Sequence, residues 1–192
     1  VSSAASDVYK RQLADRTEVL LNFIDIKQVQ RRSEEPLSDP QYTGELKFLT
    51  VGRASEEKGY DIAVQITAEL KKRGLCFKWF IIGDGRDLNK LRTMAKEYQV
   101  EQEIIFLGMR ENPAPYVKSC DLYLQPSRHE GYPITIVEAR SLQKVIIASD
   151  IPSMREQIRD GENGYLCPLD VMQFADKIQK VIADQELSLI HI

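Results

Sequence analysis

The chain has 192 residues, of which 43% are hydrophobic and 29% charged, a composition typical of a globular protein rather than a disordered or fibrous one. Its net charge of −3 lacks the basic excess that neutralises a phosphate backbone, so we expect no nucleic-acid partner. The three scattered cysteines and two histidines form no zinc pattern, and no apolar run is long enough to span a membrane. We therefore predict no metal site, no transmembrane segment and a cytoplasmic protein whose thiols are reduced core or near-core residues.

The two ends of the chain carry no pattern of a folded element. Residues 1–12 show no apolar periodicity, and residues 187–192 form a short apolar stub after a polar helix. We interpret 1–12 as a non-native or disordered leader and 187–192 as a non-native tail, and we exclude both from reasoning about the fold.

Between the ends, short apolar runs alternate with helical patterns. The runs are apolar almost throughout, which is typical of strands covered on both faces. They predict strands at 18–21, 46–51, 76–82, 103–107, 121–125, 144–148 and 164–167. The segments between them predict helices at 57–73, 86–99, 114–119, 134–142, 152–158 and 170–184, and a polar loop at 25–45. Repeated strand–helix–strand units predict an α/β fold, a Rossmann-like open parallel sheet with helices on both faces.

In such a sheet, ligands bind beyond the carboxyl ends of the strands. The loop after the first long strand runs from Gly52 to Gly59 and contains Arg53 and Lys58. Glycine lets backbone approach a ligand closely, and a guanidinium and an ammonium beside a helix N-terminus suit a diphosphate. The spacing is not that of a Walker A loop, and two solvated surface cations are the alternative interpretation.

A second loop, at 127–139, surrounds the start of a predicted helix. Gly131 and Pro133 flank that start, so the backbone amides there would be unpaired donors. Glu130 lies on the loop and Glu138 about a turn and a half inside the helix, so both carboxylates can face the crevice and accept hydrogen bonds from sugar hydroxyls. A favourable helix dipole would explain Glu130 but not Glu138.

Two other features are weaker signals. Residues 83–86, Gly-Asp-Gly-Arg, look like half of a dinucleotide fingerprint, but Leu88 stands where the third glycine belongs, so a tight strand-to-helix turn is favoured over a nicotinamide site. His129 beside Glu130 is interpreted as a packing or hydrogen-bonding residue rather than a general base.

Together, and in this order, these residues closely resemble the carboxyl-terminal half of retaining glycosyltransferases of family four, which have the GT-B fold. The matching segments are G-R-x-x-x-x-K-G at 52–59, Gly-Asp-Gly at 83–85, Phe-Leu-Gly at 106–108, D-L-Y-L-Q-P-S at 121–127, the glutamates at 130 and 138, Ala-Ser-Asp at 148–150 and D-G-E-N-G at 160–164. Residues 22–25 are similar to the segment that opens this half, and the resemblance covers about residues 16–184.

The resemblance implies a domain at 46–186 that binds a nucleoside-diphosphate sugar, after an opening strand and polar linker at 13–45. In the family, the residues matching Arg53 and Lys58 hold the donor diphosphate, and the glutamate matching Glu138 binds the ribose. The glutamate matching Glu130 lies by the transferred sugar. No cofactor is implied, and no metal, because the two cations offset the charge of the leaving group.

Backbone completes the site that the resemblance implies. Gly52 would lie at the diphosphate, and the segment just past Gly108, near Met109, would meet the base. The amides matching Gly131 and Tyr132, with Pro133 beside them, would lie near the sugar.

The implied reaction is transfer of a hexosyl group, with retention, to a saccharide or lipid-linked acceptor in polysaccharide biosynthesis. The acceptor would bind an amino-terminal domain that this sequence lacks, so we expect the chain to bind donor without turnover. The full enzyme would be cytoplasmic or at the inner face of the membrane. The alternatives are a nucleotide-sugar 2-epimerase-like enzyme and a non-catalytic donor-binding partner subunit.

The sequence departs from the family pattern after Glu138. Gln143 stands where the family has glycine, and Val145 where it has proline. Because glycine readily takes the left-handed conformation that ends a helix, we expect the turn at Gln143 to differ locally. Such variants suggest a capsule or exopolysaccharide subgroup.

Overall fold

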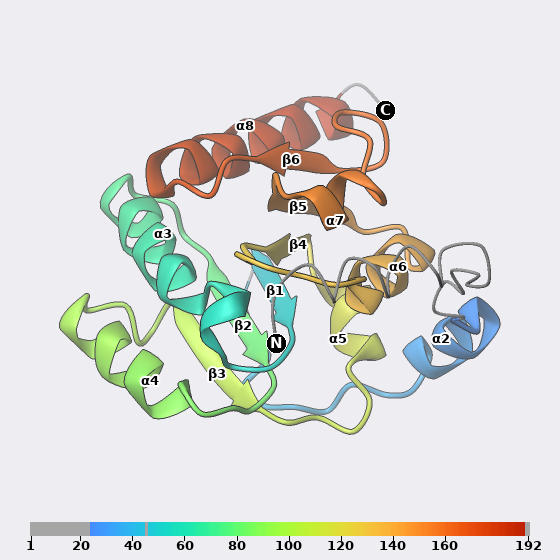
Figure 1. The fold of residues 1–192 in the computed structure, drawn as a ribbon, viewed down its shortest axis with the longest axis horizontal. Coiled ribbons are helices and arrows are strands. Elements are labelled where there is room, and N and C mark those ends of the chain that lie inside the picture. Colours follow the sequence, from blue (N-terminus) through green and yellow to red (C-terminus); the bar gives the residue numbers. More distant parts are fainter. Residues whose placement is uncertain (1–23, 45, 191–192) are drawn as a thin grey trace, which may run out of the picture.

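A six-stranded parallel sheet forms the centre of the molecule, in a computed structural model that describes residues 24–44 and 46–190, the last six as backbone only (Figure 1). The strands are β1 (Lys47–Val51), β2 (Lys78–Ile82), β3 (Ile104–Gly108), β4 (Leu122–Gln125), β5 (Val145–Ser149) and β6 (Tyr165–Cys167). The helices are α2 (Ile26–Ser33), α3 (Tyr60–Lys72), α4 (Leu88–Glu97), α5 (Ala114–Ser119), α6 (Ile134–Ser141), α7 (Pro152–Arg155) and α8 (Val171–Ile190), with a 3₁₀ turn η1 (Glu56–Lys58). The predicted fold class and the six predicted strands from residue 46 onward are confirmed, whereas the strand at 18–21 and the leader at 1–12 lie outside the described residues.

Helices cover both faces of this sheet and bury a separate apolar core on each. Phe48 of β1 points into the core formed with α3, α4 and α8, which includes Trp79 and Phe174. The next residue, Leu49, points into the opposite core, formed with α5, α6 and α7. Successive strand residues thus alternate between two buried layers, which explains why the strand sequences are apolar throughout.

The order of the strands, β3-β2-β1-β4-β5-β6, places the reversal of the chain between β1 and β4. From β1 the chain adds β2 and β3 on one side, then crosses to add β4, β5 and β6 on the other (Figure 1). At such a reversal the loops that follow the two central strands leave in opposite directions and open a crevice. The loops after β1 and β4 are the two that the sequence analysis identified as the candidate site.

The prediction of a polar loop across residues 25–45 is wrong, because residues 26–33 form helix α2. Asp25 caps it by accepting a hydrogen bond from the Gln28 amide at 3.0 Å. Its fixed position comes from polar contacts to other segments: Arg32 donates to the Glu111 carbonyl at 2.9 Å, and Asn112 donates to the Arg32 carbonyl at 2.9 Å. A helix held in this way has no long apolar stripe for periodicity to detect.

The expectation that the turn at Gln143 differs from a left-handed helix end is also wrong. Gln143 itself takes the left-handed conformation, with φ of 56°. The turn closes by hydrogen bonds from the Lys144 amide to the Ala139 carbonyl at 3.0 Å and from the Gln143 amide to the Arg140 carbonyl at 2.9 Å. This is the pattern that glycine usually supports, so glutamine carries the conformational strain instead.

The cysteines follow the prediction in part. Cys120 and Cys167 are buried thiols, as expected of core residues, but Cys76 is exposed just before β2. Of the described helices, α8 is longer than its predicted span of 170–184, and none of them is both long enough and apolar enough to cross a membrane.

Candidate functional site

The loop after β1 is pressed against the end of β4, and its closing glycine makes this possible. Gly59 has a φ of 67°, and a Cβ at this position would collide with the backbone carbonyl of Pro126. Only a residue without a side chain fits so close to the neighbouring loop. Gly52 at the start of the loop is similarly crowded, because a Cβ there would lie 2.9 Å from the Tyr60 hydroxyl.

Hydrogen bonds then join the loop after β4 to the loop after β1. The amides of Arg128 and His129 donate to the Glu57 carbonyl at 2.8 and 3.2 Å. Arg128 also makes two hydrogen bonds of 2.6 Å to the Asp61 carboxylate at the start of α3. Burial would raise the pKa of Asp61, but hydrogen bonds and charge from Arg128 outweigh it and lower that pKa. The two loops are therefore a single joined structure.

Lys58 and Glu130, which lie 72 positions apart in the sequence, form an ion pair where these loops meet. The Lys58 ammonium donates to both carboxylate oxygens, at 2.7 and 2.8 Å. The Glu130 side chain is only 8% exposed and that of Lys58 22% exposed. A buried carboxylate of this kind is stable only when it is paired and hydrogen-bonded.

Arg53 lies on the same loop but faces a different neighbour. With Gly52 it lines one wall of a cleft of about 330 Å³, and Met109 and Pro113, beyond the end of β3, line the opposite wall. Arg53 is exposed, and its guanidinium has no hydrogen bond or ion pair with any described residue. Gly52 lies between the cleft and the Lys58–Glu130 ion pair: it lines the cleft, and a Cβ on it would lie 3.4 Å from the Lys58 side chain.

Gly83 and Asp84 also line this cleft, and the segment 83–85 forms a tight turn after β2, as predicted. Gly83 has a φ of 141° and contacts the Gly52 carbonyl, and a Cβ on Gly85 would collide with the Ala54 backbone. The Asp84 carboxylate accepts from the Gly85 amide at 2.7 Å. These glycines allow the close approach of the neighbouring loop, which is sufficient to explain their positions.

Glu138 lies inside α6, and its carboxylate has no hydrogen bond or ion pair among the residues that the structure describes. The side chain is half-buried. Burial raises the pKa of Glu138, and the charge of Arg32 opposes that rise only in part. A half-buried acid with a raised pKa and no hydrogen-bond partner among the described residues is a candidate for a functional group.

The backbone at the start of α6 also remains open. No side chain caps the helix at Pro133, and a Cβ on Gly131 would meet nothing within 4 Å. Gly131 is exposed and Tyr132 partly so. Gly108 has a φ of 74° and ends β3 directly before Met109, whose side chain is 72% exposed.

The structure thus brings together two groups of the predicted residues: Lys58 with Glu130, and Arg53 with Gly52 and Met109. Glu138 and the residues at the start of α6 make no contact with either group that the described hydrogen bonds, ion pairs or cleft lining record. Sequence reasoning did not anticipate that Gln125 and Ser127 also bind the Glu130 carboxylate, or that Arg128 pairs with Asp61. The available signal was a glutamine and a serine at the end of an otherwise apolar strand.

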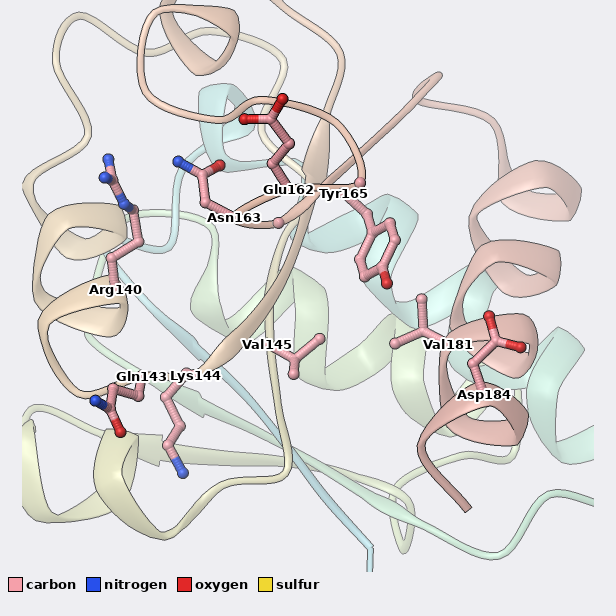
Figure 2. A pocket seen from close by; sticks show the side chains of 11 residues that line it. Arg140, Gln143, Lys144, Val145, Glu162, Asn163, Tyr165, Val181 and Asp184 are labelled. Carbon is pink, nitrogen blue, oxygen red and sulfur yellow. The ribbon is translucent and has the colours of Figure 1, made fainter. Parts of the chain in front are cut away.

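A larger cavity, of about 430 Å³, lies at the opposite edge of the sheet. Figure 2 shows the side chains around it, which come from the end of α6, the turn before β6 and helix α8. It opens beside Val145 and Tyr165, the first residues of β5 and β6, and includes none of the predicted site residues. Among the described residues, no three His, Cys, Asp or Glu side chains gather closely enough to hold a metal ion.

Comparison with known families identifies the chain. A family model described as Glycosyl transferases group 1 matches residues 32–190. The chain belongs to this family. It is 29% identical over 172 residues to the uncharacterized glycosyltransferase MJ1059 of Methanocaldococcus jannaschii, covering 88% of this chain and 40% of that protein. It is 27% identical over 157 residues to a Campylobacter jejuni enzyme, N-acetylgalactosamine-N,N'-diacetylbacillosaminyl-diphospho-undecaprenol 4-alpha-N-acetylgalactosaminyltransferase, covering 81% of this chain and 41% of the enzyme.

Two solved structures show the same fold. HepE of Anabaena, determined in complex with UDP, has a TM-score of 0.75 at 22% identity, with 95% of this chain and 53% of HepE covered. The C-terminal domain of the group 1 glycosyltransferase LpcC of Francisella tularensis has a TM-score of 0.71 at 23% identity, with 86% of this chain and 90% of that domain covered. The fold is that of the carboxyl-terminal half of a GT-B glycosyltransferase. The chain spans between 32% and 41% of the length of the curated relatives that it matches.

Proposed function

We propose that this chain is the donor-binding half of a retaining glycosyltransferase and that it binds a nucleoside-diphosphate sugar. The full enzyme would transfer the hexosyl group of that donor to a saccharide or lipid-linked acceptor in polysaccharide biosynthesis. One observation carries the proposal: the loops after β1 and β4 meet at the reversal of the sheet, with Lys58 on Glu130 and Arg53 in the adjoining cleft. The names of the Campylobacter enzyme and of the colanic acid glycosyltransferase WcaL of Escherichia coli support an acceptor of this class.

Charge explains why two cations belong here. As the bond between the anomeric carbon and the leaving oxygen breaks, negative charge grows on the diphosphate. Cations fixed in place beforehand stabilise that transition state more than the ground state, and we infer that they do so without a metal. Lys58 has three N–H donors and uses two on Glu130, so one remains for a phosphate oxygen. Arg53 can supply a planar pair of donors from the cleft.

The two glutamates, the exposed backbone at the start of α6 and Met109 would bind the ribose, the sugar and the base of the donor. The Glu138 carboxylate, which lacks a partner among described residues, can accept hydrogen bonds from the two ribose hydroxyls. Glu130 retains accepting capacity for a hydroxyl of the transferred sugar, and the exposed amides near Gly131 lie next to it in the chain. Met109, on the far wall of the cleft, would lie against the base.

Arg53 gives the cleaner test of this proposal, because removing it leaves no buried partner unpaired. We expect Arg53→Ala in this chain to weaken binding of the preferred nucleoside diphosphate by about tenfold or more, the value of a charged hydrogen bond. Calorimetry with UDP, GDP and ADP measures it. Arg92→Ala, at an exposed arginine of α4 outside the site, is the matched control and should bind as the unmodified chain does.

In the complete enzyme, Arg53→Ala and Lys58→Ala should each lower kcat/KM about 10²-fold or more, since each removes a charge that acts in the transition state. Near-normal turnover in both variants, or an unmodified chain that binds none of the three nucleotides, would contradict the proposal.

A further inference from the structure

The two oxygens of the Glu130 carboxylate are in different states. Oε1 accepts three hydrogen bonds, from the Lys58 ammonium at 2.7 Å, the Ser127 hydroxyl at 2.7 Å and the Gln125 amide at 3.0 Å. Oε2 accepts one, from Lys58 at 2.8 Å. Because each carboxylate oxygen has about two accepting positions, Oε1 is filled, whereas Oε2 keeps one position free of the described residues.

Gln125 and Ser127 carry no charge, so electrostatic attraction between ions does not explain their contact with the Glu130 carboxylate. Both side chains are fully buried, at 0% exposure. Their hydrogen bonds to each other and to Glu130 all point the same way: the Gln125 amide donates to the Ser127 hydroxyl at 2.9 Å, and that hydroxyl donates to Oε1. The donors converge on a single atom.

The direction of this chain of hydrogen bonds is fixed at its other end by the backbone of β1. The Val51 amide donates to the Tyr123 hydroxyl at 3.3 Å, and that hydroxyl donates to the amide oxygen of Gln125 at 3.3 Å. With its oxygen engaged by Tyr123, Gln125 can only turn its NH₂ group toward Ser127 and Glu130. Burial raises the pKa of the Tyr123 phenol, so it stays protonated and remains a donor.

We propose that Gln125 and Ser127 are positioning residues for the donor sugar: they occupy Oε1 of Glu130 and so present Oε2 alone, in one orientation, to a sugar hydroxyl. The inference rests on the proposed function of Glu130. The inference adds that β4, and β1 through the Val51 amide, orient the carboxylate. Because β1 also leads into the loop with Arg53 and Lys58, the sugar and diphosphate parts of the site would keep a fixed position relative to each other. Buried side chains that hydrogen-bond to a functional carboxylate hold it in one orientation when they are themselves fixed by packing and hydrogen bonds.

Comparing a nucleotide with its sugar conjugate distinguishes a positioning role from a structural one. Loss of sugar positioning should weaken binding of the conjugate only, whereas a general structural defect should weaken binding of the nucleotide as well. The experiment measures, by calorimetry on this chain, the affinities for UDP, GDP and ADP and for their glucose conjugates. The readout is the ratio of sugar-conjugate affinity to nucleotide affinity, for the nucleotide that binds best. For Ser127→Ala and, separately, Gln125→Met, we expect this ratio to fall about tenfold, with the affinity for the nucleotide itself within about twofold of the unmodified chain.

Two further variants complete the design. Ser127→Thr keeps the hydroxyl and should restore the ratio. Thr67→Val removes a different fully buried hydroxyl, one that donates to the Ala63 carbonyl in α3 at 2.8 Å, and should leave both affinities unchanged. The inference is overturned if nucleotide and sugar-conjugate affinities fall together, if the ratio does not change, or if glucose adds no affinity in the unmodified chain. Failure of all nucleotides to bind would instead contradict the proposed function.

Discussion

Glu138 is the residue whose state in the structure differs most from that of an ordinary surface acid. Its side chain is half-buried in a helix whose neighbouring positions Ile136 and Ala139 are fully buried. No described residue hydrogen-bonds to its carboxylate, and Arg32 influences it only through charge. A buried acid without a partner destabilises the folded chain, and such groups are found more often where a ligand will supply the missing donors.

The raised pKa of Glu138 leads to opposite effects of acid on binding and on stability. Because Glu138 is protonated at a higher pH than an ordinary glutamate, nucleotide affinity should fall as the pH drops through that raised value, since a neutral carboxyl is a poorer acceptor for ribose hydroxyls. Over the same interval the contribution of Glu138 to the free energy of unfolding, taken as the difference between the unmodified chain and Glu138→Gln, should rise, because the folded state binds this proton more readily than the unfolded state. Calorimetry and urea unfolding, each repeated from neutral pH downward, measure the two trends.

Glu138→Gln is the control for this prediction. It should show the weaker affinity already at neutral pH and lose the pH dependence that is specific to the carboxyl. The diphosphate itself titrates in both proteins, so only the difference between them reports on Glu138. Identical affinity profiles for the two proteins would exclude a role for Glu138 at the ribose.

At the scale of elements, the end of α6 shows how the fold tolerates an unfavourable residue. Gln143 and Gln99 both adopt left-handed conformations at helix ends, with φ of 56° and 55°. Both are exposed, and neither side chain makes a hydrogen bond within the described part of the chain. The turn is therefore determined by the backbone bonds and the packing of β5, with local preference overridden.

Gln143→Gly should stabilise the protein. Relief of the left-handed strain is worth about 1–2 kcal/mol, and the greater freedom of glycine in the unfolded chain offsets part of it, so we expect a net gain of about 0.5–1 kcal/mol. Gln143→Ala keeps a Cβ and should bring no such gain. Urea unfolding at unchanged m-value measures both. A loss of stability in the glycine variant would show that the glutamine side chain has a role of its own.

The elements also show what sequence could and could not predict. The continuous apolar runs identified the strands of residues 46–167, because both faces of the sheet are buried. Helix α2 was not predicted, because its position depends on hydrogen bonds to distant segments, such as that from Arg32 to the Glu111 carbonyl, which no local sequence pattern encodes. In the site, the order of motifs located Lys58 and Glu130, but their contact across 72 positions and the support from Gln125 arise only from the topology.

For the molecule as a whole, we propose that the candidate site is one wall of a larger active site. The joined loops and the cleft lie at the carboxyl edge of the sheet, where Met109 is largely exposed. Since the chain spans between 32% and 41% of the length of the curated relatives that it matches, we propose that the remaining part of the full enzyme supplies the surface that orients the acceptor.

We expect this arrangement to separate donor binding from sugar transfer. We expect the 192-residue chain to bind the nucleoside-diphosphate sugar, because Arg53, Lys58, Glu130 and Glu138 are all on it. It should transfer no sugar at a useful rate, because bringing donor and acceptor together in a fixed orientation accounts for a large part of the barrier and needs both walls. Calorimetry and a labelled-sugar transfer assay, run in parallel on the chain and on the full-length enzyme, test this. Transfer by the chain alone at roughly 1 s⁻¹ or more, a rate ordinary for a complete enzyme, would show that the acceptor site lies within these residues and that the second wall is not needed.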